Sequence, residues 1–196
     1  MLRKQQLIQA IGELVIPLLG FFWLGWDLYF ILLFYLLDLI ATEVFYQLKL
    51  ARIHQFQQSK SSFFARFSSI GLVGVIIVLS HAMLHKVYPD LVFQDAFIDF
   101  LAYEEDGIPI AQGYLLLPLI IFGNYQQYKM FFLLPNRFRT LPGELLCHSR
   151  RNALLAALAG ITLITAVLFF TAIPELIILF LFAAGKLWFD LKRSLI

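Results

Sequence analysis

Six ionisable side chains lie inside long apolar stretches of this chain: Glu13, Asp38, Glu43, His81, His85 and Lys186. Charged groups in such surroundings are costly, and in membrane proteins they mark ion pathways, proton relays or paired helices. Asp38 lies near the middle of its stretch and has a short side chain. It must therefore face the interior of a helix bundle, carry a proton, or hold a partner.

The depth of each group follows from the helical rise of about 1.5 Å per residue. Glu13, Glu43 and Lys186 fall at similar depths in their stretches, with Asp38 about one turn deeper than Glu43. An internal ion pair of Lys186 with Asp38 or Glu43 is therefore expected. The alternative is that Lys186 extends its long stem to the headgroups. We treat Asp38, Glu43, Glu13, Lys186 and His81 as the candidate substrate or ion pathway.

His81 and His85 are four residues apart, so a helix places them on one face. Such a pair can ligate a metal or contact a haem edge, although two ligands do not complete a site. Asp90 or Glu104 could supply a third ligand. The simpler interpretation is that His81, next to Ser80, hydrogen-bonds to a neighbouring helix. No cofactor is predicted.

Composition identifies lipid as the solvent for much of the chain. Of its 196 residues, 61% are hydrophobic and 14% charged, with a mean hydropathy of +0.81. Soluble domains carry about 25% charged residues. The sequence therefore predicts an all-α, polytopic transmembrane helix bundle in a cell membrane, formed by a single domain over 1–196. A single cysteine, Cys147, excludes an intramolecular disulfide.

About six stretches are long enough to span a bilayer, which needs about 20 apolar residues in a helix. Their approximate bounds are 7–24, 28–48, 67–85, 113–134, 152–171 and 174–190. Pro118 is expected to kink the fourth span, and Asn152 is a candidate cap for the fifth.

Basic residues are segregated to one side of these spans. All Lys and Arg residues except Lys86 and Lys186 fall in or near the two termini and two of the connections. Cytoplasmic segments are enriched in such residues. Both termini and both basic connections share a side only if the number of spans is even. The sequence therefore predicts six spans, with the N- and C-termini in the cytoplasm.

The long outer connection is expected to contain a short helix over about 90–103 lying on the membrane surface. Asp95 and Asp99 share one face there, and apolar side chains fill the others. This helix could simply close the top of the bundle. With Glu104, Glu105 and Asp106 it could instead form an acidic mouth that attracts cations.

No familiar catalytic pattern is present, neither a Gly-x-Ser-x-Gly elbow nor a His-Glu-x-x-His helix. The sequence thus favours a protein that is not an enzyme. The basic connection at 137–151 is interpreted as a topological, lipid-facing element, so no nucleic acid is expected as a partner. The expected partners are the bilayer and either a second copy or another membrane protein.

Several segments resemble an uncharacterised prokaryotic membrane-protein family, a domain of unknown function with about six spans. They are Pro17-Leu18-Leu19-Gly20, Gly25-Trp26-Asp27, Tyr35-Leu36-Leu37-Asp38, the stretch from Phe63-Phe64 through Gly71 to His81, and Lys186-Leu187-Trp188-Phe189-Asp190. The family usually has Glu at the position of Asp38, and His-Tyr-Gly where this chain has Ser69-Ile70-Gly71. The resemblance implies no reaction, but it groups Trp26, Asp38, His81, Lys186 and Asp190 as residues of interest.

Two functions compete. The first is a small transporter or ion-coupled permease, in which Asp38 responds to protons or cations, Lys186 is its partner and His81 lies on the outer access path. The second is a non-enzymatic assembly, sensor or immunity-type subunit, in which the intramembrane charges specify helix pairing. An intramembrane redox subunit using His81 has the least support.

Overall fold

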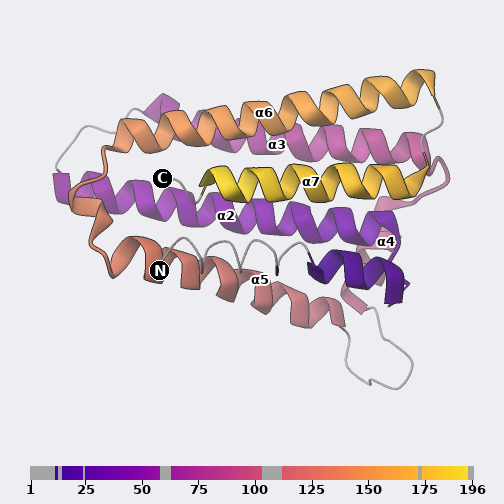
Figure 1. Ribbon diagram of the computed structural model, residues 1–196, viewed down its shortest axis with the longest axis horizontal. Helices are drawn as coiled ribbons and strands as arrows, with labels where there is room; N and C mark the ends of the chain where they lie inside the picture. Colours follow the sequence, from indigo (N-terminus) through magenta and orange to yellow (C-terminus); the bar gives the residue numbers. More distant parts are fainter. Residues whose placement is uncertain are drawn as a thin grey trace.

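A computed structural model describes residues 12, 15–23, 25–57, 63–102, 112–171 and 174–193 (Figure 1). These residues form helices and connections, with no strand among them. Residues 15–23 are helical. The labelled elements are α2 (Leu28–Gln57), α3 (Phe63–Val87), α4 (Phe93–Ala102), α5 (Gln112–Tyr128), η1 (Lys129–Leu133), η2 (Arg137–Arg139), α6 (Gly143–Phe170) and α7 (Glu175–Arg193).

Helix α2 is the central element of the bundle. It packs against α3, α4, α5, α6 and α7, while α3 also packs along α6. Figure 1 shows the long helices aligned roughly along one axis, with α6 and α3 on one side of α2 and α5 on the other. Residues 28–36 are all buried. This agrees with the sequence, because a helix that is apolar all round belongs inside a bundle.

The start of α2 is fixed by a tight turn. Gly25 has a φ of 66°, a conformation that glycine adopts without strain. The Trp26 N–H then donates to the Gly20 carbonyl at 3.0 Å. Asp27 caps the helix, because its Oδ1 accepts the Phe30 N–H at 2.6 Å.

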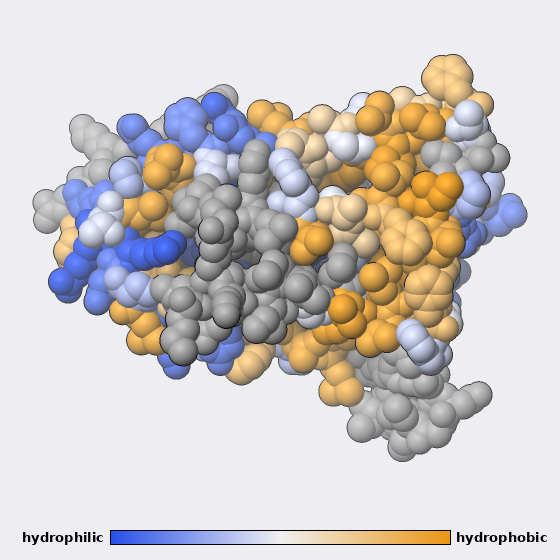
Figure 2. Space-filling model, in the orientation of Figure 1, coloured by the Kyte–Doolittle hydropathy of each residue, from blue (hydrophilic) through white to orange (hydrophobic). Residues whose placement is uncertain are grey.

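Three of the helices are long and apolar enough to cross a membrane: Leu28–Gln57, Phe67–Val87 and Gly143–Phe170. Large apolar side chains remain exposed on them, as at Val78 and Leu163, which are 67% and 66% exposed. Figure 2 shows hydrophilic residues gathered at the end of the bundle where α2 finishes, and apolar residues toward the end where α2 begins. Association with a membrane explains this surface.

Two helices extend well beyond the spans expected from the sequence. Helix α2 continues past residue 48 to Gln57, and α6 begins at Gly143, upstream of Asn152. The expectation that Asn152 caps a helix is wrong, because Pro142 occupies the N-cap position. Arg150 and Arg151 therefore belong to α6 and not to a connection. The two arginines did not stop the helix, because Arg150 is buried against neighbouring helices and Arg151 is exposed at the surface.

The fourth stretch is interrupted. Helix α5 contains Pro118 and gives way at Lys129 to the π-helical turn η1. The chain then reverses at Asn136, whose φ is 55°. The expected outer helix at 90–103 is present as α4, Phe93–Ala102.

A second, small core lies at the hydrophilic end of the bundle. Its buried members are Tyr46, Leu50, Ile53, Phe132, Phe138 and Leu146. They come from the last turns of α2, from η1 and η2, and from the first turns of α6. This core continues the bundle beyond its main apolar part.

Candidate functional site

Asp38 lies in an ion pair at the centre of the bundle. Lys186 Nζ is 3.0 Å from Asp38 Oδ2. Asn124 Nδ2 donates to Asp38 Oδ1 at 2.8 Å, and Thr42 Oγ1 donates to Asn124 Oδ1 at 3.0 Å. Helices α2, α5 and α7 thus meet at one carboxylate, which we call the Asp38 cluster.

Helix geometry brings these groups to one level. Asp38 lies about 15 Å along α2 from Leu28, and Lys186 lies about 16 Å along α7 from Glu175. Both helices start at the same end of the bundle (Figure 1). Of the two partners expected for Lys186, the structure places Asp38 against it. The side chains of Lys186 and Asp38 are 12% and 11% exposed.

Glu43 forms a second ion pair, and its partner is Arg150. Arg150 Nε and Nη2 both donate to Glu43 Oε2, at 3.0 Å and 2.9 Å. Glu43 Oε1 accepts from Gln47 Nε2 at 2.7 Å and from Ser69 Oγ at 2.6 Å. Four donors from α2, α3 and α6 therefore surround this carboxylate, in what we call the Glu43 cluster.

The cation of the Glu43 cluster is also held by an aromatic ring. The Arg150 guanidinium carbon is 5.7 Å from the centre of the Tyr46 ring. The Tyr46 hydroxyl donates to Cys147 Sγ at 3.3 Å. Arg150 is thus fixed by charge, hydrogen bonds and a cation–π contact at once.

Sequence reasoning missed Arg150, Asn124, Gln47 and Ser69 as members of these clusters. Arg150 was assigned to a basic connection because it stands beside Arg151. A usable signal was its spacing, since Leu146, Ala153 and Leu154 are buried on the same face of α6. The signal for Asn124 was its position within the predicted fourth span, 113–134, where a polar side chain needs a partner.

The histidines do not join the ion pairs. His81 Nδ1 lies 2.8 Å from the Ile77 carbonyl on its own helix, and the His81 ring packs edge-on to Tyr29 and Phe93. The exposed His85 contacts the same Phe93 ring. Among the described residues there is no group of three potential metal ligands. Glu13, Glu104, Glu105 and Asp106 lie outside them.

One pocket lies beside the start of α2, away from the Glu43 cluster. Its volume is about 200 Å³, and Gly25, Trp26, Asp27, Tyr29, Phe30, Leu91, Ala96, Asp99 and Phe100 line it. Nearby, burial raises the pKa of the Tyr88 hydroxyl, and a hydrogen bond with Glu175 raises it further. Tyr88 is therefore neutral at physiological pH and ties the connection after α3 to the start of α7.

No family model, curated protein or solved structure matches the chain. The resemblance to a six-span family therefore stays a prediction. Of the residues that it groups, Asp38 and Lys186 contact each other, whereas Trp26 and His81 lie toward the end of the bundle where α2 begins.

The two clusters are suited to different chemistry. Glu43 accepts four hydrogen bonds, two of them from the Arg150 guanidinium. Asp38 binds the Lys186 ammonium and the Asn124 amide, and its side chain is 11% exposed, against 8% for Glu43. An ammonium on a flexible stem moves away more readily than a guanidinium fixed by several contacts. Asp38 is therefore the better candidate for an exchangeable proton or cation.

Proposed function

We propose that the chain crosses the cell membrane six times, with both termini in the cytoplasm. The proposal is supported by the three long apolar helices and by the alternating direction of the helices along the bundle. The basic ends of α2 and α6 then face the cytoplasm, as the distribution of Lys and Arg requires. The hollow near Trp26 and Asp99 faces outward.

Within that topology, we propose that the protein is a small ion-coupled permease in which Asp38 is the proton-responsive group. The observation that carries this proposal is the Asp38–Lys186 pair, in which Lys186 Nζ is 3.0 Å from Asp38 Oδ2 between two helices of the bundle. A proton arriving at Asp38 removes its charge and releases Lys186. Because Lys186 is on α7 and Asp38 on α2, release loosens one helix against the centre of the bundle.

Reconstitution in liposomes tests the permease directly. With a pH gradient and a trapped pH-sensitive dye, the protein is expected to dissipate the gradient faster than protein-free liposomes. Asp38→Asn should abolish the difference. Asp90→Asn, a matched change at an exposed turn residue, should leave it intact.

A neutral double variant separates activity from folding. Asp38→Asn with Lys186→Met removes both charges together, so no unpaired ion remains and the fold should persist. This double variant should still show no proton flux, because no side chain at the position of Asp38 can then exchange a proton. Flux at the wild-type rate in this variant would refute the role of Asp38.

A second function, that of a non-enzymatic assembly subunit, is favoured by a different observation. The pocket near Trp26 is lined by neither Asp38 nor Glu43, and each carboxylate binds donors from two other helices. Such closed pairs can specify helix packing without moving any ion. Co-purification of a stoichiometric membrane partner, with no flux in liposomes, would favour this function.

A further inference from the structure

Two arginines at the hydrophilic end of the bundle are held by aromatic rings. The Arg52 guanidinium carbon lies 5.5 Å from the centre of the Phe138 ring, and that of Arg139 lies 5.8 Å from the same ring. Arg139 also lies 5.4 Å from the centre of Phe56. The two rings pack edge to face, with centres 5.3 Å apart. Two positive groups thus converge on one aromatic pair.

Neither guanidinium is neutralised by a carboxylate of the described residues. Arg52 Nη1 donates to the neutral Gln55 Oε1 at 3.3 Å, and the Arg139 guanidinium lies over the rings of Phe56 and Phe138. Both arginines are exposed. A guanidinium that rests its face on a ring keeps N–H groups at its edge available, and that edge matches the geometry of a phosphate.

The rings that hold these arginines are themselves anchored. Phe138 is buried in the small second core with Phe132 and Ile53. Gln57 Nε2 donates to the carbonyls of Phe138 and Leu141, at 3.2 Å and 3.1 Å, and so ties η2 to the end of α2. The guanidinium groups therefore rest on aromatic rings that are held in place, which reduces the conformational entropy lost when a ligand binds.

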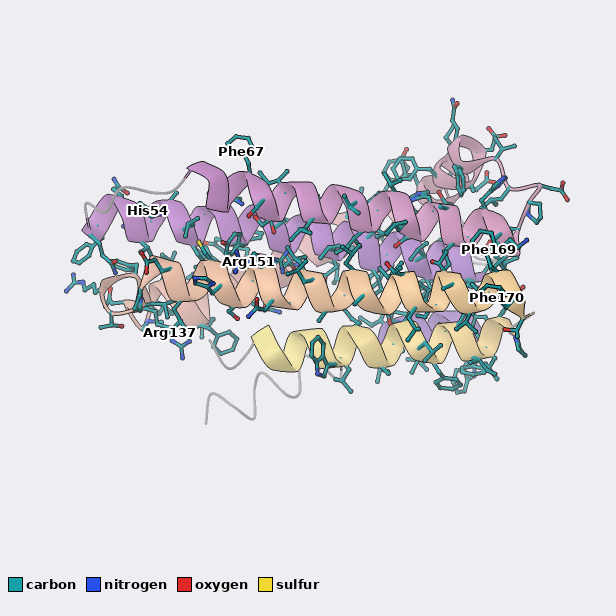
Figure 3. All side chains as sticks on the ribbon, turned by 90° about the horizontal axis from the view of Figure 1, so that it is seen from above. His54, Phe67, Arg137, Arg151, Phe169 and Phe170 are labelled. Carbon is teal, nitrogen blue, oxygen red and sulfur yellow. The ribbon has the colours of Figure 1, made fainter. Side chains whose placement is uncertain are left out.

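The position of Arg52 along α2 puts the two arginines and their aromatic rings at the level of the lipid headgroups. The helix has 30 residues, about 45 Å in length, whereas the hydrocarbon core is about 30 Å thick. The start of α2 is apolar and buried, so the excess length lies at its other end. Arg52 is about 36 Å from Leu28 along the helix. Figure 3 shows Arg137 at the same end as His54, with Phe169 and Phe170 at the far end.

We propose that Arg52 and Arg139 form a binding site for the phosphate of an anionic phospholipid in the adjacent leaflet. Charge complementarity and the proximity of the apolar helix surface favour a lipid over a soluble ligand. The cationic side chains of Lys129 and Arg137 lie on the same side, in η1 and η2, and add to the attraction. The proposal does not depend on proton exchange at Asp38.

Lipid-dependent thermal stability in detergent tests the site. Added phosphatidylglycerol is expected to raise the melting temperature of the full-length protein more than phosphatidylcholine does. In the double variant Arg52→Gln, Arg139→Gln, the apparent affinity for phosphatidylglycerol should fall about tenfold, because both charge-assisted contacts are lost. Without added lipid, the double variant should melt close to the wild type, since both side chains are exposed.

Two controls make the test specific. Arg151→Gln removes one charge at an exposed position of α6, where Arg151 contacts His148. This variant should keep the preference for phosphatidylglycerol. Arg52→Lys with Arg139→Lys keeps the charge but not the planar fork, and should lose most of the preference. Full retention in the lysine variant would overturn the site, because net charge alone would then account for binding.

Measurements with soluble phosphate compounds distinguish a lipid phosphate from a free phosphate as the ligand. Inorganic phosphate and glycerol phosphate, at the concentration of the lipid headgroup, should give little stabilisation. Equal stabilisation by these ions would overturn the assignment to a lipid. Equal responses to phosphatidylglycerol and phosphatidylcholine, or an unchanged response in the glutamine variant, would overturn the site itself.

Discussion

At the scale of single residues, the two acids of α2 differ in how they are held. Glu43 faces a guanidinium and accepts two further hydrogen bonds, whereas Asp38 faces an ammonium on a flexible stem. Removing one member of a buried pair leaves the other charged and unpaired, which is more damaging than removing both. Removing Arg150 or Lys186 alone should therefore destabilise the protein more than neutralising both members of either pair.

Glu43→Gln is expected to lower the free energy of unfolding by about 3 kcal/mol, because Arg150 would be left buried without its counter-charge. Thermal unfolding in detergent, followed by circular dichroism, measures this change. Glu144→Gln, at an exposed acid in the first turn of α6, is the matched control and should have little effect. The double variant Glu43→Leu, Arg150→Leu should recover much of the loss. An unchanged melting temperature in Glu43→Gln would contradict the importance of this pair.

At the scale of the helices, α4 and α5 meet through a glycine. A Cβ added to Gly113, at the start of α5, would overlap the Phe100 carbonyl oxygen and Leu101 Cα. Backbone atoms cannot move aside as a flexible side chain can. Phe100 is also buried against Phe30 of α2, with ring centres 4.5 Å apart. The position of α4 over the end of the bundle therefore depends on the absence of a side chain at residue 113.

Gly113→Ala should therefore separate α4 from α5 and destabilise the protein by about 2 kcal/mol. Gly74→Ala is the control, because Gly74 lies exposed within α3 and an added Cβ meets nothing within 4 Å. That change should be neutral or stabilising, by up to about 1 kcal/mol, since alanine favours a helix over glycine. Chemical denaturation of both variants in the same detergent gives the comparison. A Gly113→Ala protein as stable as the Gly74→Ala protein would argue against the close approach.

At the scale of the whole molecule, the distribution of charge and the length of the helices together predict the orientation in the membrane. The long helices alternate in direction, and their hydrophilic ends gather at one end of the bundle (Figures 1 and 2). A helix such as α2 is longer than the hydrocarbon core, and its excess carries Lys49 and Arg52. This end is the one expected in the cytoplasm.

A reporter fused after Ile196 tests this orientation. The even number of proposed spans predicts a cytoplasmic C-terminus, so a reporter that is active only after export should stay silent. A cytoplasmic reporter at the same position should be active. The reverse pattern would contradict the proposed topology, because either the number of spans would be odd or both termini would lie outside the cytoplasm.

The sequence by itself determined the class of this protein. Helix periodicity and apolar length are local properties, so they were sufficient to predict the all-helical fold and α4, and the intramembrane acids stood out from their apolar neighbours. The partners of those acids were decided by the tertiary structure. Arg150 and Asn124 are 107 and 86 residues away from Glu43 and Asp38, and no local pattern fixes how two such helices are rotated against each other. Packing around the buried α2 sets that rotation, and with it which cation meets which carboxylate.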